Sequence, residues 1–323
     1  MTPSNHTADT LPRGFIPVML TPFLESGAID SPGLAHLTDY YIASGAAGLF
    51  ANCLSSEMYE LTDSERLSIT KQVVERAGGQ VPVVATGTFG GSIAQQADFV
   101  KRIYDTGVQA VIVITSHLAS EAESDAVFLD RMHQLMALTE AIPLGFYECP
   151  VPYKRLINSD ILRELLPTGR LVYHKDTCLD ADEVSRRLAV ARGYNFALYD
   201  AYMVNAVSSL RAGAAGLCCI QGNIFPELIT WLCTHFDDAA RQDGVNEVQQ
   251  FLTDSMDLVH TAYPTIAKYS LKKQGLPITL KTRRVVEPLT PALQNNMDDL
   301  LKTVAELRKN LGIEASFPVS SKA

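Results

Sequence analysis

Eight short apolar segments alternate with amphipathic helical segments between residues 14 and 236. The apolar segments have the character of buried strands and lie at 15–20, 47–52, 81–86, 110–115, 143–148, 170–175, 195–200 and 214–219. The segments between them place apolar residues at helical spacing, and two of them end on glycine, at residues 45 and 107. Such an alternation implies parallel β/α units, and roughly 220 residues for eight units fit a closed (β/α)8 barrel better than an open doubly wound sheet.

The chain changes character after residue 236, because the strand pattern stops there. Three further segments have helical spacing, at residues 245–263, 264–275 and 291–312. The sequence therefore predicts an α/β chain with a TIM barrel and a C-terminal helical appendage. Its parts are a loose N-terminal arm at 1–13, the catalytic barrel at 14–236 and the helical region at 237–323. A dinucleotide-binding sheet is disfavoured, since no G-x-G-x-x-G motif follows the first strand.

The composition argues against several classes of partner. The 323 residues carry a formal net charge of −9 without a basic stripe, so no nucleic-acid partner is expected. No apolar run approaches the roughly 20 residues of a transmembrane helix, so no membrane partner is expected, and the polar N-terminus lacks the apolar core of a signal peptide. The six cysteines include no C-x-x-C pair, which favours reduced thiols in a cytoplasmic protein over a disulfide framework.

A lysine ends the sixth predicted strand, in the stretch LVYHKDT at residues 171–177. Functional groups of a barrel gather at the C-terminal ends of its strands. Because side chains alternate along a strand, Leu171, Tyr173 and Lys175 share one face, and Lys175 stands at the barrel mouth if that face points inward. Burial disfavours the charged form of a lysine, and the free amine can form a Schiff base with a carbonyl substrate.

Neighbouring strand ends supply companions for this lysine. Tyr147, which ends the fifth strand, is a candidate general acid/base. Ser55 and Ser56, after the second strand, can bind a carboxylate through hydroxyl and backbone N–H groups. Each residue also has a structural explanation, because strand-end lysines reach solvent and serines are common in loops. Their joint placement favours a catalytic site. Asp and His residues do not repeat at metal-ligand spacing, so no metal site is expected.

Three short motifs appear in order along the chain and identify a family. YECP (147–150) is similar to a YNVP-type motif, HKDT (174–177) is similar to an IKD[ST] motif, and GNIFPE (222–227) contains an N-x-x-P. In this order the motifs resemble the dihydrodipicolinate synthase/N-acetylneuraminate lyase family, class I pyruvate-dependent aldolases on a (β/α)8 barrel. The resemblance runs from about residue 14 to at least residue 311. It implies that Lys175 is the Schiff-base nucleophile and Tyr147 the general acid/base. It further implies that Ser55 and Ser56 bind the carboxylate and that Thr177 shapes the pocket.

Departures from the family pattern bear on the substrate. The family's strand-two motif G-[TS]-T-G-E reads CLSSE at residues 53–57, so Leu54 stands where members carry a proton-relaying hydroxyl. The synthase's tyrosine pair after the fourth strand reads HL at 117–118, and its arginine after the YNVP motif reads Pro152. These losses disfavour dihydrodipicolinate synthase proper. Met203 and Ile220 are expected to make the pocket wall apolar, which favours a less polar aldehyde or a short keto acid over a sugar.

The leading hypothesis is a lyase, an aldolase that cleaves or forms a C–C bond of a pyruvate-type 2-oxo acid through a Schiff base on Lys175. Two alternatives remain. One is a 2-keto-3-deoxy acid dehydratase that uses the same Schiff base, and the other is a catalytically impaired barrel that only binds carboxylates. No cofactor or metal is required, because the lysine supplies the electron sink. The expected partners are a 2-oxo acid and an aldehyde, and the resemblance implies a homo-oligomer, often a tetramer.

Overall fold

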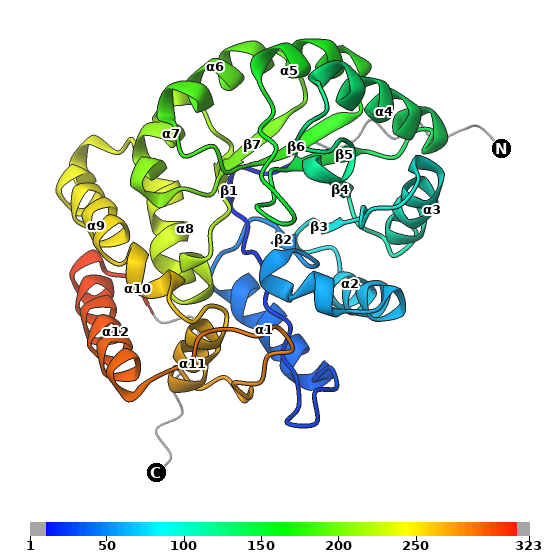
Figure 1. Cartoon of the computed structure of the whole chain (residues 1–323). Helices are drawn as coiled ribbons and strands as arrows, with labels where there is room; N and C mark the ends of the chain where they lie inside the picture. The colour runs from blue at the N-terminus through cyan, green and yellow to red at the C-terminus, as the bar shows by residue number, and fades with distance from the viewer. Residues whose placement is uncertain (1–10, 315–323) are drawn as a thin grey trace.

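Eight parallel strands curl into a (β/α)8 barrel in the computed structural model, which describes residues 11–314 (Figure 1). The strands are β1 Gly14–Phe15, β2 Leu49–Phe50, β3 Val83–Thr86, β4 Ala110–Ile114, β5 Leu144–Tyr147, β6 Leu171–Asp176, β7 Ala197–Asp200 and β8 Gly216–Leu217. Hydrogen bonds join them in the order β1-β8-β7-β6-β5-β4-β3-β2. The segment after β1 completes the circle, because Val18 bridges Phe50. The predicted barrel is thereby confirmed. Strands β2 to β8 lie in the predicted segments to within one residue, whereas β1 overlaps the segment predicted at 15–20 only at Phe15.

Eight helices surround the barrel (Figure 1). They are α1 Ser31–Ala43, α2 Asp63–Ala77, α3 Ile93–Tyr104, α4 Asp125–Leu138, α5 Ser159–Leu165, α6 Ala181–Ala191, α7 Ala206–Ala212 and α8 Pro226–His235. Side-chain caps begin several of them. A capping box precedes α2, since the Thr62 hydroxyl accepts from the Glu65 N–H and the Glu65 carboxylate accepts from the Thr62 N–H.

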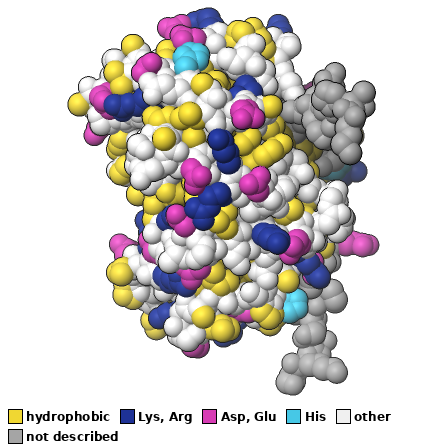
Figure 2. All heavy atoms as spheres, turned by 90° about the vertical axis from the view of Figure 1, so that its right-hand side faces the viewer, with side chains coloured by type: hydrophobic (Ala, Val, Ile, Leu, Met, Phe, Trp, Pro, Cys, Tyr) yellow, Lys and Arg dark blue, Asp and Glu magenta, His cyan; other side chains and the backbone are white. Residues whose placement is uncertain are grey.

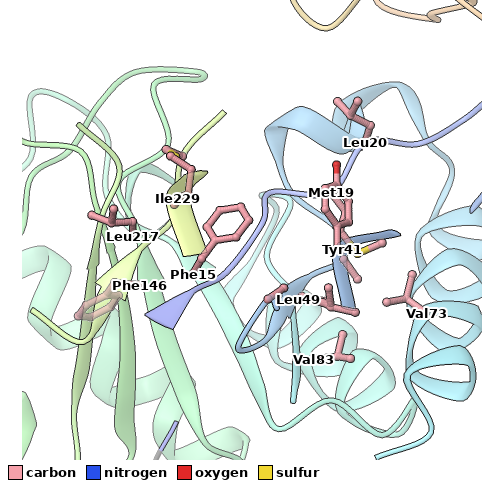
Figure 3. Close-up of a cluster of buried hydrophobic side chains, with 14 of the residues drawn as sticks. Phe15, Met19, Leu20, Tyr41, Leu49, Val73, Val83, Phe146, Leu217 and Ile229 are labelled. Carbon is pink, nitrogen blue, oxygen red and sulfur yellow. The ribbon is translucent and has the colours of Figure 1, made fainter. Parts of the chain in front are cut away.

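The apolar side chains form two layers, one outside the strands and one inside the barrel. Figure 3 shows the outer layer, where Tyr41 of α1 and Val73 of α2 lie beside Leu49 and Val83 of the sheet. Inside the barrel, aromatic rings fill the space below the mouth, and those of Tyr173 and Tyr199 stack 5.0 Å apart. The packed interior leaves the functional groups at the C-terminal ends of the strands.

Four helices follow the barrel, namely α9 Gln242–Asp254, α10 Met256–His260, α11 Thr265–Lys273 and α12 Pro291–Leu311. The helix predicted over residues 245–263 is therefore two helices. A buried ion pair ties this region to the barrel, because Lys268 Nζ of α11 lies 2.9 Å from Glu57 Oε1 after β2. Glu57 also accepts hydrogen bonds from the backbone N–H groups of Arg283 and Arg284. The C-terminal region is held over the barrel mouth as a result.

The first described residues of the chain pack against the barrel. Residues 1–10 of the predicted arm lie outside the described residues. At the C-terminus of the chain, residues 315–323 also lie outside them. The next three residues pack against the barrel instead of hanging free. Leu11 is buried, the Tyr199 hydroxyl donates to the Pro12 carbonyl at 2.6 Å, and Arg13 Nη2 donates to the Ala214 carbonyl at 3.0 Å. The packed chain therefore begins by Leu11, three residues before the predicted barrel boundary.

The exposed surface mixes charges of both signs. Figure 2 shows Lys and Arg side chains interspersed with Asp and Glu on one whole face of the molecule. Partly exposed ion pairs of the molecule include Arg76–Asp39 and Arg131–Glu123. Between residues 11 and 314, no helix is long and apolar enough to cross a membrane.

Candidate active site

Lys175 and Tyr147 lie side by side at the barrel mouth. They occupy paired positions on the adjacent strands β6 and β5, and Lys175 Nζ lies 4.3 Å from the centroid of the Tyr147 ring. Both side chains are almost fully buried, with exposed fractions of 4% for Lys175 and 3% for Tyr147. Within the described residues Lys175 has no carboxylate partner. The adjacent Asp176 pairs with Arg187 instead. The amine is therefore available to a ligand in the cavity that both residues line.

This cavity has a volume of about 530 Å³. Its wall is apolar at Leu54, Ile220 and Met256, and its rim carries the charged residues Lys154 and Arg284. The volume lies within the usual range for small-molecule sites, roughly 300–1,000 Å³. A three-carbon acid fills only part of that space, so the cavity can also accommodate a second reactant.

The three residues expected to contact the carboxylate or shape the pocket have different environments. Ser55 lines the cavity, whereas Ser56 does not. The Ser56 hydroxyl donates to the Met19 carbonyl at 2.6 Å and accepts from the Cys53 N–H at 3.0 Å, so it is committed to holding the loop. This is a correction to the expected role of its side chain. Thr177 lines the cavity, and its hydroxyl donates to the Glu148 carbonyl at 2.7 Å.

Leu54 faces the cavity and offers no proton, but another polar chain leads away from Tyr147. The thiol of Cys149 lies close to the hydroxyls of Tyr147 and Tyr59. The Tyr59 hydroxyl donates to the Val151 carbonyl at 2.8 Å, and its oxygen lies 3.1 Å from His117 Nε2. Burial raises the pKa of Tyr147 well above its usual value and also raises the pKa of Cys149. Both groups therefore keep their protons at neutral pH and can donate hydrogen bonds.

The pocket wall differs from the one that the sequence suggested. Met203 is fully buried in the apolar core and does not line the cavity, while Ala201 and Tyr202 take that position. Ile220 does line the cavity, as expected. Residues 203–205 form a 3-10 turn that packs against α9, and Met203 joins the apolar core. Tyr202 thus joins a wall that also contains polar residues such as Ser55, Thr177 and Gln221.

A buried charged cluster lies on the outer side of the same two strands. Arg187 of α6 places its Nη1 atom 3.0 Å from Glu148 Oε1 and 2.5 Å from Asp176 Oδ2. His174 Nε2 lies 3.5 Å from Glu148 Oε1. Burial alone would raise the pKa of Glu148, but His174 and Arg187 outweigh it and lower the value to about 2. The cluster fixes the strand segments that carry Tyr147 and Lys175.

The cluster also has the composition of a possible cation site, because Glu148, His174 and Asp176 bring ligand atoms within 4.8 Å of one another. The guanidinium of Arg187 already supplies positive charge to both carboxylates. Glu148 further accepts hydrogen bonds from the N–H groups of Ile157 and Thr177. These partners satisfy the carboxylates, so the residues present fit an ion-pair network better than a metal centre.

Asp200, at the end of β7, should make stability depend on pH. Burial raises its pKa from 3.8 to about 6, and the neighbouring Asp176 adds to the rise. The folded state therefore binds the proton more tightly than the unfolded state. The stabilisation is complete below pH 4 and is lost as the pH rises through 6. We expect the free energy of unfolding of the wild type, minus that of Asp200→Asn, to fall by roughly 1–3 kcal/mol between pH 4 and pH 7. Urea unfolding across this range measures the difference, and a flat difference would contradict the assignment.

Several residues of the cavity were not anticipated from the sequence. Asp257, His260, Tyr263 and Arg284 all come from the C-terminal region and line the cavity. Their sequence pattern is that of ordinary helices and connections, and long-range contacts such as the Lys268–Glu57 and Arg283–Glu65 ion pairs hold them at the mouth. Cys149 could have been noticed as the unusual third residue of the YECP motif.

The fold and the cavity define a (β/α)8 barrel of the enzyme type, with a lysine and a tyrosine converging at the C-terminal ends of adjacent strands. The chain belongs to the dihydrodipicolinate synthetase family, whose model matches residues 11–306. This finding confirms the resemblance that the motifs indicated.

Curated relatives agree with this membership, and solved structures agree with the fold. The chain is 26% identical to 4-hydroxy-tetrahydrodipicolinate synthase from Saccharophagus degradans, over 86% of this chain and 93% of that protein. It is 24% identical to the synthase of the same name from Shewanella piezotolerans, over 94% and 99% of the two chains. A prophage protein of the dihydrodipicolinic acid synthase family from E. coli K12, solved in complex with pyruvate, has a TM-score of 0.80 at 20% identity, covering 91% of this chain and 98% of that chain. The dihydrodipicolinate synthase from Acinetobacter baumannii, also solved with pyruvate, has a TM-score of 0.80 at 21% identity, covering 91% and 99%.

Proposed function

We propose that the protein is a class I aldolase that forms a Schiff base between Lys175 and a pyruvate-type 2-oxo acid. The observation that carries the proposal is the placement of a buried, unpaired lysine beside Tyr147 in a cavity of a barrel of this family. Solved proteins of the same fold are described as complexes with pyruvate, which supports a short 2-oxo acid as the first ligand.

The chemistry follows from the two side chains. Lys175 Nζ attacks the ketone carbon, and loss of water leaves an iminium. In the cleavage direction, the Tyr147 oxygen takes the proton of the hydroxyl at the bond to be broken while its own phenolic proton passes into the polar chain that ends at His117. The C–C bond electrons then flow to the iminium nitrogen, and an aldehyde leaves behind an enamine. Protonation of the enamine carbon and addition of water release the 2-oxo acid and the free lysine. Synthesis is the reverse, with the Tyr147 hydroxyl giving its proton to the aldehyde oxygen.

The polar chain behind Tyr147 provides a route for that proton in place of the hydroxyl that Leu54 lacks. A proton can move from Tyr147 through the Cys149 thiol and the Tyr59 hydroxyl towards His117. Burial lowers the pKa of His117, which favours the neutral imidazole as a proton acceptor. In this arrangement Tyr147 is the group that touches substrate, and the other three position it or exchange protons with it.

The second reactant is a less polar aldehyde than a sugar or the second substrate of dihydrodipicolinate synthase. Leu54, Ile220 and Met256 leave part of the wall without hydrogen-bond partners for a hydroxyl-rich chain, whereas Thr177, Gln221 and Asp257 line the cavity elsewhere. An unpaired buried hydroxyl costs about 1–3 kcal/mol. Arg155 cannot replace the arginine missing at Pro152, because its guanidinium is buried and pairs with Asp125 at 2.8 Å. By resemblance to the family we also expect a cytoplasmic homo-oligomer, often a tetramer.

Borohydride trapping tests the proposal directly. The protein is incubated with pyruvate, reduced and digested, and the peptides are mapped by mass. We expect a reduced pyruvyl adduct on Lys175, after which an aldehyde screen identifies the acceptor. Product analysis then separates an aldolase, which releases an aldehyde, from a dehydratase, which releases water. If neither pyruvate nor larger 2-oxo acids leave an adduct on the folded protein, a barrel that only binds carboxylates becomes the better description.

A further inference from the structure

One tyrosine of the cavity comes from outside the barrel. Tyr263 lies in the connection between α10 and α11, yet it lines the cavity together with Lys175 and Ser55. Its hydroxyl lies close to Ser55, which affects its pKa. The C-terminal region thus adds a polar group next to a residue of the loop after β2.

A buried amide fixes the direction of the hydrogen bonds around Tyr263. Asn223 is fully buried, and its Oδ1 atom accepts from the Tyr41 hydroxyl. Its Nδ2 atom donates to the Val18 carbonyl at 2.9 Å and to Tyr263 Oη at 2.7 Å. Rotating the amide by 180° would set its NH2 group against the Tyr41 hydroxyl and its oxygen against the Val18 carbonyl, which cannot donate. The Tyr263 oxygen therefore accepts a hydrogen bond from the Asn223 amide.

Counting protons shows what remains for a ligand. Tyr263 and Ser55 carry two hydroxyl protons, and at most one of them can lie between the two oxygens. Since Asn223 donates to Tyr263, none of these protons is needed by the amide. Burial raises the pKa of Tyr263 well above its usual value, so the phenol keeps its proton. At least one O–H of the pair can therefore donate to an acceptor in the cavity.

We propose that Tyr263 is a substrate-binding residue that, together with Ser55, donates a hydrogen bond to the carboxylate of the 2-oxo acid. The inference rests on the proposed function, because it places the carboxylate of the compound that reacts with Lys175. An anionic oxygen is the acceptor that profits most from such a donor. Ser56 cannot fill this place, since its hydroxyl is bonded to Met19 and Cys53. The helical region after the barrel thereby completes the binding site.

Removal of the single hydroxyl tests this assignment, with a matched control in the same network. The pyruvate concentration for half-maximal borohydride trapping is measured for the wild type, Tyr263→Phe, Ser55→Ala and the double variant. A hydrogen bond to a charged group is worth about 1.5–3 kcal/mol, so we expect Tyr263→Phe to raise that concentration roughly 10- to 100-fold with an unchanged final adduct yield. Tyr41→Phe removes the hydroxyl of the other phenol bonded to Asn223, and Tyr41 does not line the cavity. It should lower the melting temperature with less than a threefold effect on half-saturation.

The outcomes separate the inference from the proposed function. If the wild type forms an adduct and Tyr263→Phe has the same half-saturation, the role of Tyr263 is disproved while Lys175 chemistry stands. Equal effects of Tyr41→Phe and Tyr263→Phe would mean that the network is only structural, which also overturns the inference. If Tyr263→Phe does not fold, Ser55→Ala alone must still raise the half-saturation at least tenfold. In folded variants, the double variant should lose less than the sum of the single losses, because the two hydroxyls act as one donor pair.

Discussion

Lys175→Ala is expected to abolish both turnover and covalent trapping. The loss in kcat should be at least roughly 10⁴-fold, as for removal of a covalent nucleophile in other enzymes. Alanine cannot form the iminium that accepts the C–C bond electrons, and no other amine replaces it at the same distance from Tyr147. The methyl side chain should pack without strain beside the aromatic rings of Phe50 and Tyr147 that now surround the amine. Steady-state assays and borohydride trapping, done on the same folded preparation, measure the two losses.

Lys154→Ala is the matched control for this experiment. Lys154 also lines the cavity, but its side chain is exposed and its Nζ atom donates to the Thr177 carbonyl at 2.9 Å. The control should still form the pyruvyl adduct, because Lys154 lies at the rim rather than beside Tyr147. If Lys175→Ala retains turnover, or if trapping moves to Lys154, the assignment of the nucleophile is wrong. If the wild type never forms an adduct and Lys175→Ala binds pyruvate equally well, the protein is a carboxylate-binding barrel.

The fold and the central pair could be predicted because both are local in the sequence. Each strand is a short apolar run, and the β/α alternation leaves few topologies other than the barrel. Lys175 and Tyr147 end their strands, and parallel strands bring their C-terminal ends to one edge. Two-residue periodicity then assigns Lys175 to the inner face and Asp176 to the outer one. Asp176 does pair outward with Arg187 of α6.

The rest of the site depends on contacts that local patterns do not contain. Ser55 and Ser56 are adjacent serines, and only the 3-10 turn after β2 decides that one faces the cavity while the other holds the loop. Tyr263 reaches the cavity because Lys268 pairs with Glu57, 211 positions away in the sequence. Nothing in the sequence around residue 263 shows that contact. Met203 was misplaced for a similar reason, since its direction depends on one turn after β7.

The buried cluster behind the catalytic strands yields the largest expected effect on stability. Arg187→Met should lower the free energy of unfolding by about 3–5 kcal/mol, the usual cost of removing one partner of a buried ion pair. Arg187 is 1% exposed, and both Glu148 and Asp176 are 0% exposed. Methionine fills much of the arginine volume, so the loss comes chiefly from two carboxylates left without their shared cation. Arg186→Ala, a change at the neighbouring exposed position on α6, should cost less than about 1 kcal/mol. Urea unfolding at pH 7 compares the two variants.

A second substitution distinguishes loss of charge pairing from loss of packing. Asp176→Asn in the Arg187→Met background removes one of the stranded charges, so the double variant should recover part of the stability. If packing were the cause, the double variant would be no more stable than Arg187→Met.

Acid gives an independent test through Glu148, whose pKa of about 2 lies below its usual value of 4.5. Its stabilising contribution is present above pH 4.5 and is lost as the pH falls towards 2. Without Arg187 that pKa should rise, so the wild type should lose more of its stability between pH 5 and pH 3 than Arg187→Met does. An equal loss in both proteins would mean that Arg187 does not hold the cluster, and that the strands carrying Lys175 and Tyr147 are fixed by packing alone.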